Sequence, residues 1–313
     1  MNVLLTGQWP EDECALWRTA LAAAMPEARW LDAEAARREG RAVRAAVVAN
    51  PASGVLAGWP GVEFVQSLWA GVDRLLADNS VPAHLPIARM VDPALSAAMA
   101  ETALWATLSL HRGFFDYQRQ QSGGQWRQMA QRRAEDVCVL LLGLGEMGRA
   151  VASRIGALGY RVLGWRLRPG AVIEGVAQHD GESALWPLLS QADVVINLLP
   201  LTPETRGLLN RRFFAAMPRT AAVVNLARGA HVVDDDLLQA LDQGQLRHAV
   251  LDVFHTEPLP LEHRYWRHAG VTLLPHVAAL TDVRSASAVV AMNLRALRDG
   301  RPLAHLVRRQ RGY

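Results

Sequence analysis

The feature that most constrains the fold is a glycine-rich turn made of Gly143, Leu144, Gly145, Glu146, Met147 and Gly148. It follows an apolar run typical of a buried strand and opens a segment with helical spacing. The first glycine permits a tight turn, the second lets a pyrophosphate approach the backbone, and the third lets helix and strand pack closely. The helix N-terminus then offers unpaired N–H groups to phosphates. The turn therefore predicts a βαβ unit that binds a dinucleotide through these six residues.

The strand after this helix indicates which dinucleotide binds. An NAD site usually carries an acid about 20 residues beyond the glycines, where it binds the ribose 2′-OH. Here Arg166 occupies that position and Arg168 follows it. A guanidinium can bind a 2′-phosphate through two hydrogen bonds, whereas a carboxylate would repel it. We therefore expect NADPH as the cofactor, with NADH possible; the alternative is that both arginines are solvated surface residues.

Short apolar runs alternate with helical segments along the whole chain. Strands are predicted at 3–6, 45–49, 62–67 and 87–90, and in a second series at 137–142, 161–165, 194–199, 222–226, 249–253 and 271–274. Strands alternating with helices are typical of parallel sheets covered on both faces. The sequence therefore predicts an α/β protein with two doubly wound parallel-sheet domains, a Rossmann cofactor domain and a flavodoxin-like substrate domain.

The predicted domains are discontinuous in the chain. Residues 1–95 plus 284–313 are expected to form the substrate-binding domain, and 96–283 the NAD(P)-binding domain. One long helix is predicted over 94–121, and another over 282–298. Because ligands of doubly wound sheets bind at the carboxyl ends of the strands, the substrate is expected in the crevice between the domains.

Composition narrows the classes of function. The formal charge is only +3, and all 33 basic residues are arginines because the chain has no lysine. Schiff-base chemistry needs an amine that can lose its proton, and a P-loop needs its lysine. Aldolase-type, pyridoxal-type and P-loop functions are therefore disfavoured. The mild basicity is weak support for a nucleic-acid partner, and none is expected.

The cysteines and the lengths of the apolar runs indicate the cellular compartment of the protein. Cys14 and Cys138 form neither a disulfide framework nor a metal-ligand spacing, so no metal site is expected. Cys138 lies in an apolar run, which predicts a buried, inert thiol. The first residues lack the basic start and longer apolar region of a signal peptide. No run approaches the roughly 20 apolar residues that span a membrane, so we expect a cytoplasmic protein without a membrane partner.

Three later segments carry ionisable groups just after predicted strands. They contain Arg228, Glu257 and His276. Because the carboxyl ends of parallel strands share one edge of a sheet, the three side chains should face one crevice. An arginine can bind a carboxylate and polarise a carbonyl, a histidine can donate a proton, and an acid can favour the protonated imidazole. These three residues are the predicted catalytic set.

The order of these groups resembles the D-isomer-specific 2-hydroxyacid dehydrogenase family, and the resemblance extends over nearly the whole chain. It includes Ala70-Gly71-Val72-Asp73, the glycine turn, Leu199-Pro200 with Thr202 and Thr205, and the three catalytic segments. Glu257-Pro-Leu-Pro, Leu274-Pro-His-Val-Ala-Ala and the final Arg-Gly-Tyr look like one branch that acts on glyoxylate and hydroxypyruvate. The resemblance implies hydride transfer from NADPH to a small 2-oxo acid, giving glycolate or glycerate, with His276 as the general acid.

The resemblance also implies contacts with both ligands. Further cofactor contacts are implied for Leu199, Pro200, Thr205, Leu226, Ala227, Asp252 and Ala278. Asp252 is expected to support the nicotinamide site rather than to donate a proton. Trp69, Ala70 and Gly71, together with Arg228 and His276, are expected to bind the substrate. Trp69 either narrows the pocket in favour of small 2-oxo acids or packs between the domains.

The segment of about 94–135 resembles the family's dimerisation arm, which implies a homodimer. A hypothesis is that Trp126 in this arm reaches the active site of the partner subunit. Two other functions remain open at this stage. One is a different D-2-hydroxyacid dehydrogenase, and the other is a nucleotide-sensing, corepressor-like binding protein on the same fold, which fold alone does not exclude.

Overall fold

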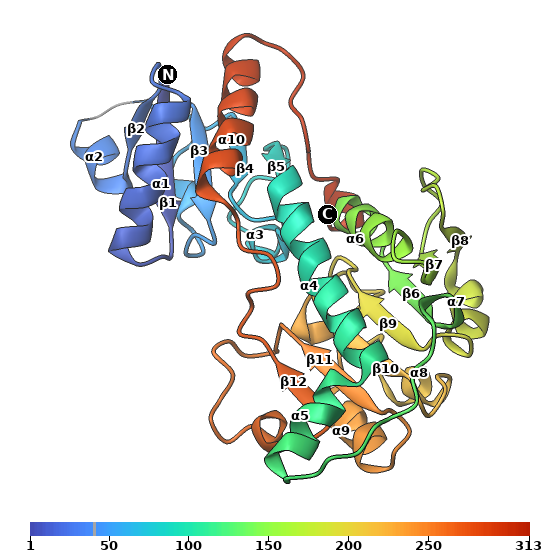
Figure 1. Ribbon diagram of the computed structural model, residues 1–313. Helices are drawn as coiled ribbons and strands as arrows, with labels where there is room; N and C mark the ends of the chain where they lie inside the picture. Colours follow the sequence, from blue (N-terminus) through green and yellow to red (C-terminus); the bar gives the residue numbers. More distant parts are fainter. Residues whose placement is uncertain (40–41) are drawn as a thin grey trace. The chain divides into compact units, whose positions relative to one another are not determined.

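The structure, a computed structural model, describes residues 1–39 and 42–313, and these divide into two compact units. One unit contains Met1–Leu95 and Thr281–Tyr313, and the other contains Ser96–Leu280. Each unit has its own parallel β-sheet with helices packed on it (Figure 1).

The first unit is built on a five-stranded sheet with the order β2-β1-β3-β4-β5, in which all neighbours are parallel. Its strands are β1 (Asn2–Gly7), β2 (Arg29–Leu31), β3 (Ala45–Ala49), β4 (Phe64–Ser67) and β5 (Ile87–Ala88). Its helices are α1 (Glu11–Ala24), α2 (Ala33–Arg38), α3 (Asp73–Ala77) and α10 (Val283–Arg298). This strand order is flavodoxin-like.

Side-chain burial explains how the first unit holds together. The central strand β3 is buried along its whole length, as expected for a parallel strand covered on both faces. One face packs its apolar side chains on Ala36 of α2 and Leu75 of α3. Helix α10 is tied to the sheet because Asn293 donates a 2.7 Å hydrogen bond to Gln66 of β4. It also lies beside α1 (Figure 1), where Arg295 donates to the carbonyl of Ala24.

The second unit is built on a seven-stranded parallel sheet with the order β12-β11-β10-β9-β6-β7-β8. Its strands are β6 (Cys138–Leu142), β7 (Arg161–Arg166), β8 (Ala177–Asp180), β9 (Val194–Asn197), β10 (Ala222–Asn225), β11 (His248–Leu251) and β12 (Val271–Leu273). Its helices are α4 (Pro93–Arg112), which begins in the first unit, α5 (Phe114–Ser122), α6 (Glu146–Gly156), α7 (Glu182–Leu189), α8 (Arg211–Ala215) and α9 (Asp234–Asp242). The first strand lies inside the sheet and the order reverses beside it, which is the Rossmann arrangement.

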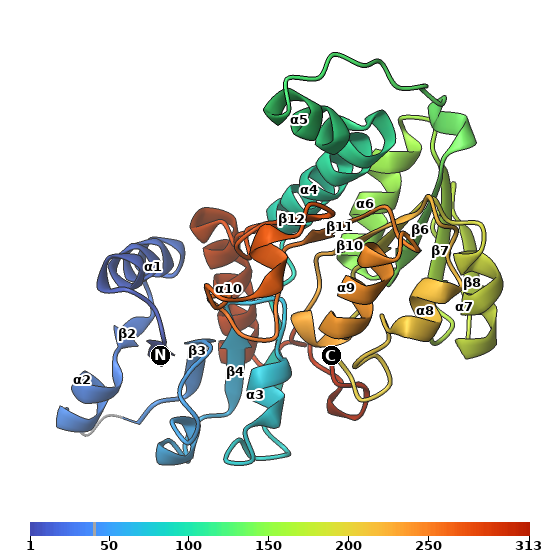
Figure 2. The same ribbon diagram turned by 90° about the horizontal axis from the view of Figure 1, so that it is seen from below.

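Alternation along the central strand β6 assigns the helices to the two faces of this sheet. Leu140 and Leu142 pack with residues of α7, α8 and α9, whereas Val139 and Leu141 pack with residues of α4, α5 and α6. The two layers of helices are visible on opposite sides of the sheet in Figure 2. Successive side chains of a strand point to opposite faces, so a run of apolar residues in β6 supplies both cores.

The predicted fold class is confirmed, but one predicted helix is wrong. The chain over 94–121 forms two helices instead of one, because Gly113 adopts a left-handed conformation with φ of 71°. A residue in that conformation ends the helical hydrogen-bond ladder. The elements β2, α2 and β8 were not predicted, because they are short and partly exposed.

The ends of the predicted strands also differ from the structure. The strand predicted over 194–199 ends at Asn197, and the strand predicted over 222–226 ends at Asn225. The apolar run continues past each ladder because the following loop residues are buried as well. Hydrophobicity alone does not mark the point where a buried strand becomes a buried loop.

The burial of Cys138 and the apolar character of the helices were both predicted from the sequence. Cys138 is buried on β6, and burial raises the pKa of its thiol, so the predicted inert state is supported. Within residues 1–39 and 42–313, none of the helices combines the length and the apolar character needed to cross a membrane.

Candidate active site

The glycine turn lies between β6 and α6, and its three glycines meet different surroundings. A Cβ on Gly143, where φ is 99°, would lie 2.8 Å from the carbonyl oxygen of Leu198. A Cβ on Gly148 would lie 2.1 Å from the carbonyl oxygen of Gly143. A Cβ on Gly145, the N-cap of α6, would meet nothing within 4 Å. The fold itself therefore requires Gly143 and Gly148, whereas Gly145 faces open space at a helix N-terminus, as a pyrophosphate site requires.

Alanine substitutions should separate these two roles. Gly148→Ala is expected to destabilise the protein by about 1–3 kcal/mol, because backbone atoms must move apart. Gly145→Ala is expected to leave the melting temperature unchanged or slightly raised but to abolish tight NADPH binding, because the methyl group would occupy the pyrophosphate space. Thermal melting and NADPH titration of both variants measure this. Equal loss of stability in the two variants would contradict the assignment.

The two arginines predicted to bind the 2′-phosphate are held differently. Arg166 ends β7, and its side chain is only 15% exposed. It donates to Asp180 of β8 at 2.6 Å and to the carbonyls of Gly170 and Ala171 at 2.8 and 2.9 Å. Arg168 is 45% exposed and lies 3.8 Å from Glu204. The pair with Asp180 directs Arg166 into the loop that carries Arg168, so Arg168 is the more accessible cation at this end of the sheet.

The structure brings His276 and Glu257 into direct contact. Nδ1 of His276 lies 2.7 Å from Oε2 of Glu257, and Oε1 accepts the backbone N–H of Phe254 at 2.9 Å. The hydrogen bond with Glu257 raises the pKa of His276, although burial opposes it. Burial alone would raise the pKa of Glu257, but the hydrogen bonds from His276 and Phe254 hold it below its ordinary value. The pair therefore stabilises an ionised carboxylate beside a protonated imidazole, with the carboxylate orienting the ring.

Arg228 follows β10 and lies close enough to this pair for its charge to act on both groups. Its positive charge contributes to lowering the pKa of Glu257 and opposes the rise of the pKa of His276. Its Nη1 donates to the carbonyl of Ala227 at 2.7 Å, and its own carbonyl accepts from Asn225 at 2.9 Å. The predicted catalytic residues therefore gather at the carboxyl edge of one sheet.

Asp252 supports the turn that carries His276. It is 1% exposed and accepts the backbone N–H groups of Val277 at 2.7 Å and of Ala278 at 3.1 Å. Its backbone carbonyl accepts the N–H of His276 at 2.9 Å. Burial raises the pKa of Asp252, although these N–H donors oppose the shift. Asp252 therefore holds the backbone of the turn that carries His276.

The other residues predicted to bind the cofactor lie in two neighbouring loops at the same edge. The loop after β9 contains Leu199, Pro200 and Thr205, and the hydroxyl of Thr205 donates to the carbonyl of Pro200 at 2.8 Å. Leu226 and Ala227 are buried after β10. Asn197 at the end of β9 joins the loops by donating to Asn225 at 2.9 Å.

The predicted substrate-binding stretch 69–71 follows β4 in the first unit. The hydroxyl of Ser67 accepts the N–H of Trp69 and donates to its carbonyl, both at 3.0 Å. The ring of Trp69 meets buried Trp17 edge to face, with centroids 6.2 Å apart. These contacts fix the backbone of Trp69 from both sides.

Several residues that organise the site were not predicted from the sequence. They are Asn197, Asn225, His231 and Asp180. The two asparagines end apolar strands, where a polar residue is a usable signal of a strand end near a ligand. Asp180 lies on the exposed edge strand β8, whose pattern gave no signal.

The second unit is a Rossmann sheet with a glycine turn, and its carboxyl edge carries an arginine, a glutamate and a histidine. This combination is typical of dinucleotide-dependent dehydrogenases. The comparisons narrow this class. Residues 104–278 match the model for the D-isomer specific 2-hydroxyacid dehydrogenase, NAD binding domain. The chain belongs to the D-isomer specific 2-hydroxyacid dehydrogenase family.

Three relatives show where in the family the similarity lies. A glyoxylate/hydroxypyruvate reductase A of Serratia proteamaculans is 40% identical over 86% of this chain and 87% of its own length. A D-isomer specific 2-hydroxyacid dehydrogenase of Xanthobacter autotrophicus, solved with NADPH and MES, is 35% identical with a TM-score of 0.93, covering 100% of this chain and 99% of that one. An NADPH-dependent glyoxylate/hydroxypyruvate reductase of Sinorhizobium meliloti, solved with NADP and sulfate, is 34% identical with a TM-score of 0.91 and the same coverage.

Proposed function

We propose that this protein reduces small 2-oxo acids with NADPH, converting glyoxylate to glycolate and hydroxypyruvate to glycerate. The observation that carries the proposal is the 2.7 Å contact between His276 and Glu257, within the electrostatic reach of Arg228. The names of the Serratia and Sinorhizobium relatives support the substrate class, and the NADPH and NADP bound in two solved relatives support the cofactor.

The residues suggest how the reduction proceeds. Arg228 binds the substrate carboxylate and polarises the 2-oxo group, because a guanidinium presents several fixed N–H donors. The nicotinamide, when bound, supplies the hydride. His276 donates a proton from Nε2 to the carbonyl oxygen as negative charge develops there, while Glu257 holds Nδ1. In the reverse direction, neutral His276 accepts that proton.

The nucleotide end of the cofactor fits the turn described above. The open space at Gly145 and the N-terminus of α6 suit the pyrophosphate. We assign Arg168 as the main ligand of the 2′-phosphate and Arg166 as the residue that holds its loop, with NADH as a weaker alternative cofactor. Trp69, Ala70 and Gly71 remain our proposed substrate-binding residues of the first unit.

The proposal is tested by following NADPH and NADH oxidation with glyoxylate, hydroxypyruvate and pyruvate as substrates. Fast NADPH oxidation with glyoxylate or hydroxypyruvate would support it. A preference for another 2-oxo acid would indicate a different D-2-hydroxyacid dehydrogenase. Tight cofactor binding without turnover of any 2-oxo acid would favour the corepressor-like alternative.

Cofactor preference can be tested in the loop that follows β7, with a control at the start of the same strand. Arg168→Gln is expected to raise the KM for NADPH by about tenfold or more, because a charge-assisted hydrogen bond to the phosphate is lost. The KM for NADH, which lacks this phosphate, should not change. Arg161→Gln, at the start of the same strand, is the matched control and should change neither KM. A parallel rise in both KM values for Arg168→Gln would refute the assignment.

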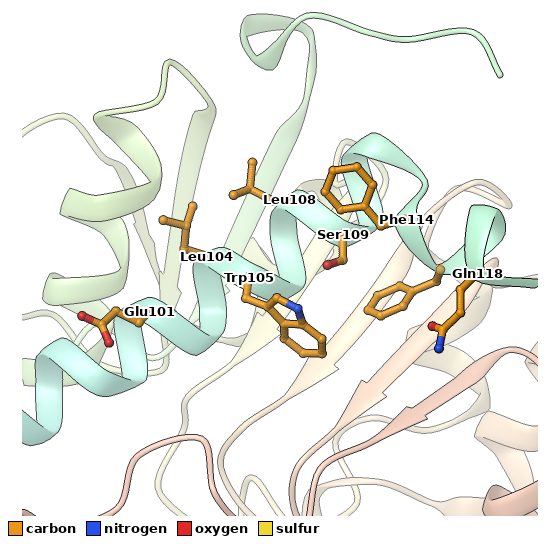
Figure 3. Close-up of a pocket in the computed structure, with 8 residues that line it drawn as sticks. Glu101, Leu104, Trp105, Leu108, Ser109, Phe114 and Gln118 are labelled. Atoms are coloured by element: carbon orange, nitrogen blue, oxygen red, sulfur yellow. The ribbon is translucent and has the colours of Figure 1, made fainter. Parts of the chain in front are cut away.

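We also propose that the protein is a cytoplasmic homodimer without a nucleic-acid or membrane partner. The support for a dimer is an apolar face on α4 and α5 in the second unit, where Trp105 and Phe114 are exposed beside a hollow of about 470 Å³ (Figure 3). Exposed aromatic side chains around a hollow are typical of protein interfaces. The segment after α5 carries Trp126, which is 97% exposed.

Sedimentation of the wild type and of Trp126→Ala tests the dimer and its arm. If Trp126 reaches the partner's active site, Trp126→Ala should raise the KM for glyoxylate while the protein stays dimeric. If Trp126 only stabilises the dimer, the variant should dissociate at higher concentration. If Trp126→Ala changed neither dimerisation nor the KM for glyoxylate, the hypothesis for Trp126 would be wrong.

A further inference from the structure

A buried histidine lies directly behind the arginine of the site. His231 is 0% exposed and ends the short 3-10 helix Gly229–His231, which follows Arg228. Its Nδ1 lies 3.1 Å from the carbonyl oxygen of Arg228, and its Nε2 lies 3.3 Å from the carbonyl oxygen of Pro200. The ring therefore lies between two loops, one that carries Arg228 and one that is proposed to contact the cofactor.

Each of these two carbonyls also accepts hydrogen bonds from other groups, and the Arg228 carbonyl accepts the backbone N–H of His231 at 3.2 Å. The Arg228 carbonyl also accepts from Asn225 at 2.9 Å, and the Pro200 carbonyl also accepts from Thr205 at 2.8 Å. Both ring nitrogens of His231 thus face oxygens that only accept hydrogen bonds. A neutral imidazole donates through one nitrogen, so His231 can donate to one of the two carbonyls, and a residue without an N–H donor loses that hydrogen bond.

The surrounding backbone leaves the Arg228 loop little room to relax. A Cβ on Gly229 would lie 2.0 Å from the carbonyl carbon of Phe254, so this turn is pressed against the loop that leads to Glu257. On its other side, the carbonyl of His231 accepts the N–H of Leu209 at 2.9 Å. A shift of the histidine ring is therefore transmitted to the backbone of Arg228.

From this geometry we infer that His231 is a positioning residue that sets the affinity for the 2-oxo acid by fixing Arg228 against the Pro200 loop. The inference rests on the proposed function of Arg228. Because a guanidinium binds a carboxylate through a planar pair of N–H groups, a small displacement of its backbone disturbs both hydrogen bonds. The same ring also contacts the Pro200 loop, whose residues are proposed to bind the cofactor.

The test compares His231→Phe, which keeps a ring but has no donor, with His231→Gln, which restores an N–H. The matched control is His248→Phe. His248 is another buried histidine of the same unit, but it starts β11 at the far end of the strand, contacts Thr272 at 2.8 Å and stacks on Phe115. Both phenylalanine variants thus lose a buried histidine that makes hydrogen bonds. Only His231→Phe changes a residue that contacts the Arg228 loop.

For His231→Phe, kcat/KM for glyoxylate is expected to fall by about 10²-fold, as a displacement of about 1 Å would cause. Calorimetry with oxalate, added to the protein with NADPH, should show weaker binding in the same variant. His231→Gln should recover part of both values. His248→Phe should lose thermal stability without a change in either value.

Equal kcat/KM values and equal oxalate affinities for His231→Phe and His248→Phe would overturn the inference. The oxalate titration separates this failure from failure of the proposed function. If the wild type turns over no 2-oxo acid, the function is wrong, yet the oxalate affinities still decide whether His231 positions the anion site. If His231→Phe does not fold, His231→Gln and His231→Leu provide the same comparison.

Discussion

Replacing His276 by asparagine is expected to lower kcat for glyoxylate reduction by about 10³-fold, within the range that a positioned general acid contributes. The variant loses the titratable nitrogen but should keep the backbone, because asparagine tolerates the left-handed conformation of this residue, where φ is 55°. NADPH binding should persist, because the glycine turn and Arg168, which are proposed to bind its phosphates, follow other strands of the sheet. Stopped-flow and steady-state NADPH oxidation measure the loss.

The matched control for this substitution is His268→Asn. His268 precedes β12 at its amino end and contacts Asp242 at 3.1 Å, whereas His276 follows the carboxyl end of the same strand. The control should retain full activity. If His276→Asn and His268→Asn reduced glyoxylate equally fast, His276 would not be the general acid.

The same pair determines the pH dependence. Reduction needs protonated His276, whose pKa is raised by its hydrogen bond to Glu257. The value of kcat/KM for reduction should therefore stay high below this raised pKa and fall as the pH rises through it, while oxidation of glycolate shows the opposite trend. Glu257→Gln should move the falling limb to lower pH. An unmoved limb would show that Glu257 does not set this pKa.

Arg228→Lys is expected to reduce kcat/KM for glyoxylate by about 10²–10³-fold although the positive charge is kept, because lysine lacks the planar fork that binds a carboxylate and a carbonyl together. Oxalate affinity should fall with it. Arg211→Lys, on the exposed start of α8, is the conservative control and should behave as the wild type. If Arg228→Lys retained wild-type kinetics, only the charge of Arg228 would matter.

Much of the fold was predictable because both sheets are buried on both faces. Strands such as β3 and β6 appear as continuous apolar runs, and the glycine turn indicates the nucleotide-binding half. The edge strands β2 and β8 were not predictable in this way, because they bury few side chains. The division of the long helix depended on the backbone conformation of Gly113, which the sequence permits but does not require.

The positions of some site residues were predictable from the sequence, and the contacts of others were not. Arg228, Glu257 and His276 follow strands, and parallel strands bring their carboxyl ends to one edge, so sequence positions translate directly into proximity. The partner of Arg166 was not predictable, because Asp180 lies on a strand that the pattern did not reveal. His231 escaped notice because its role depends on two backbone carbonyls, one of them 31 residues away in the sequence.

The left-handed backbone of His276 has a consequence for how this protein can evolve. Glycine adopts such a conformation without the steric cost that a side chain adds, about 1 kcal/mol or more. His276→Gly would relieve this cost, but it would also remove the 2.7 Å contact with Glu257 and make the unfolded chain more flexible. These effects oppose each other, so the melting temperature of His276→Gly should stay close to that of the wild type while glyoxylate reduction is lost. Selection for heat resistance alone should therefore not retain this histidine, and selection for turnover should.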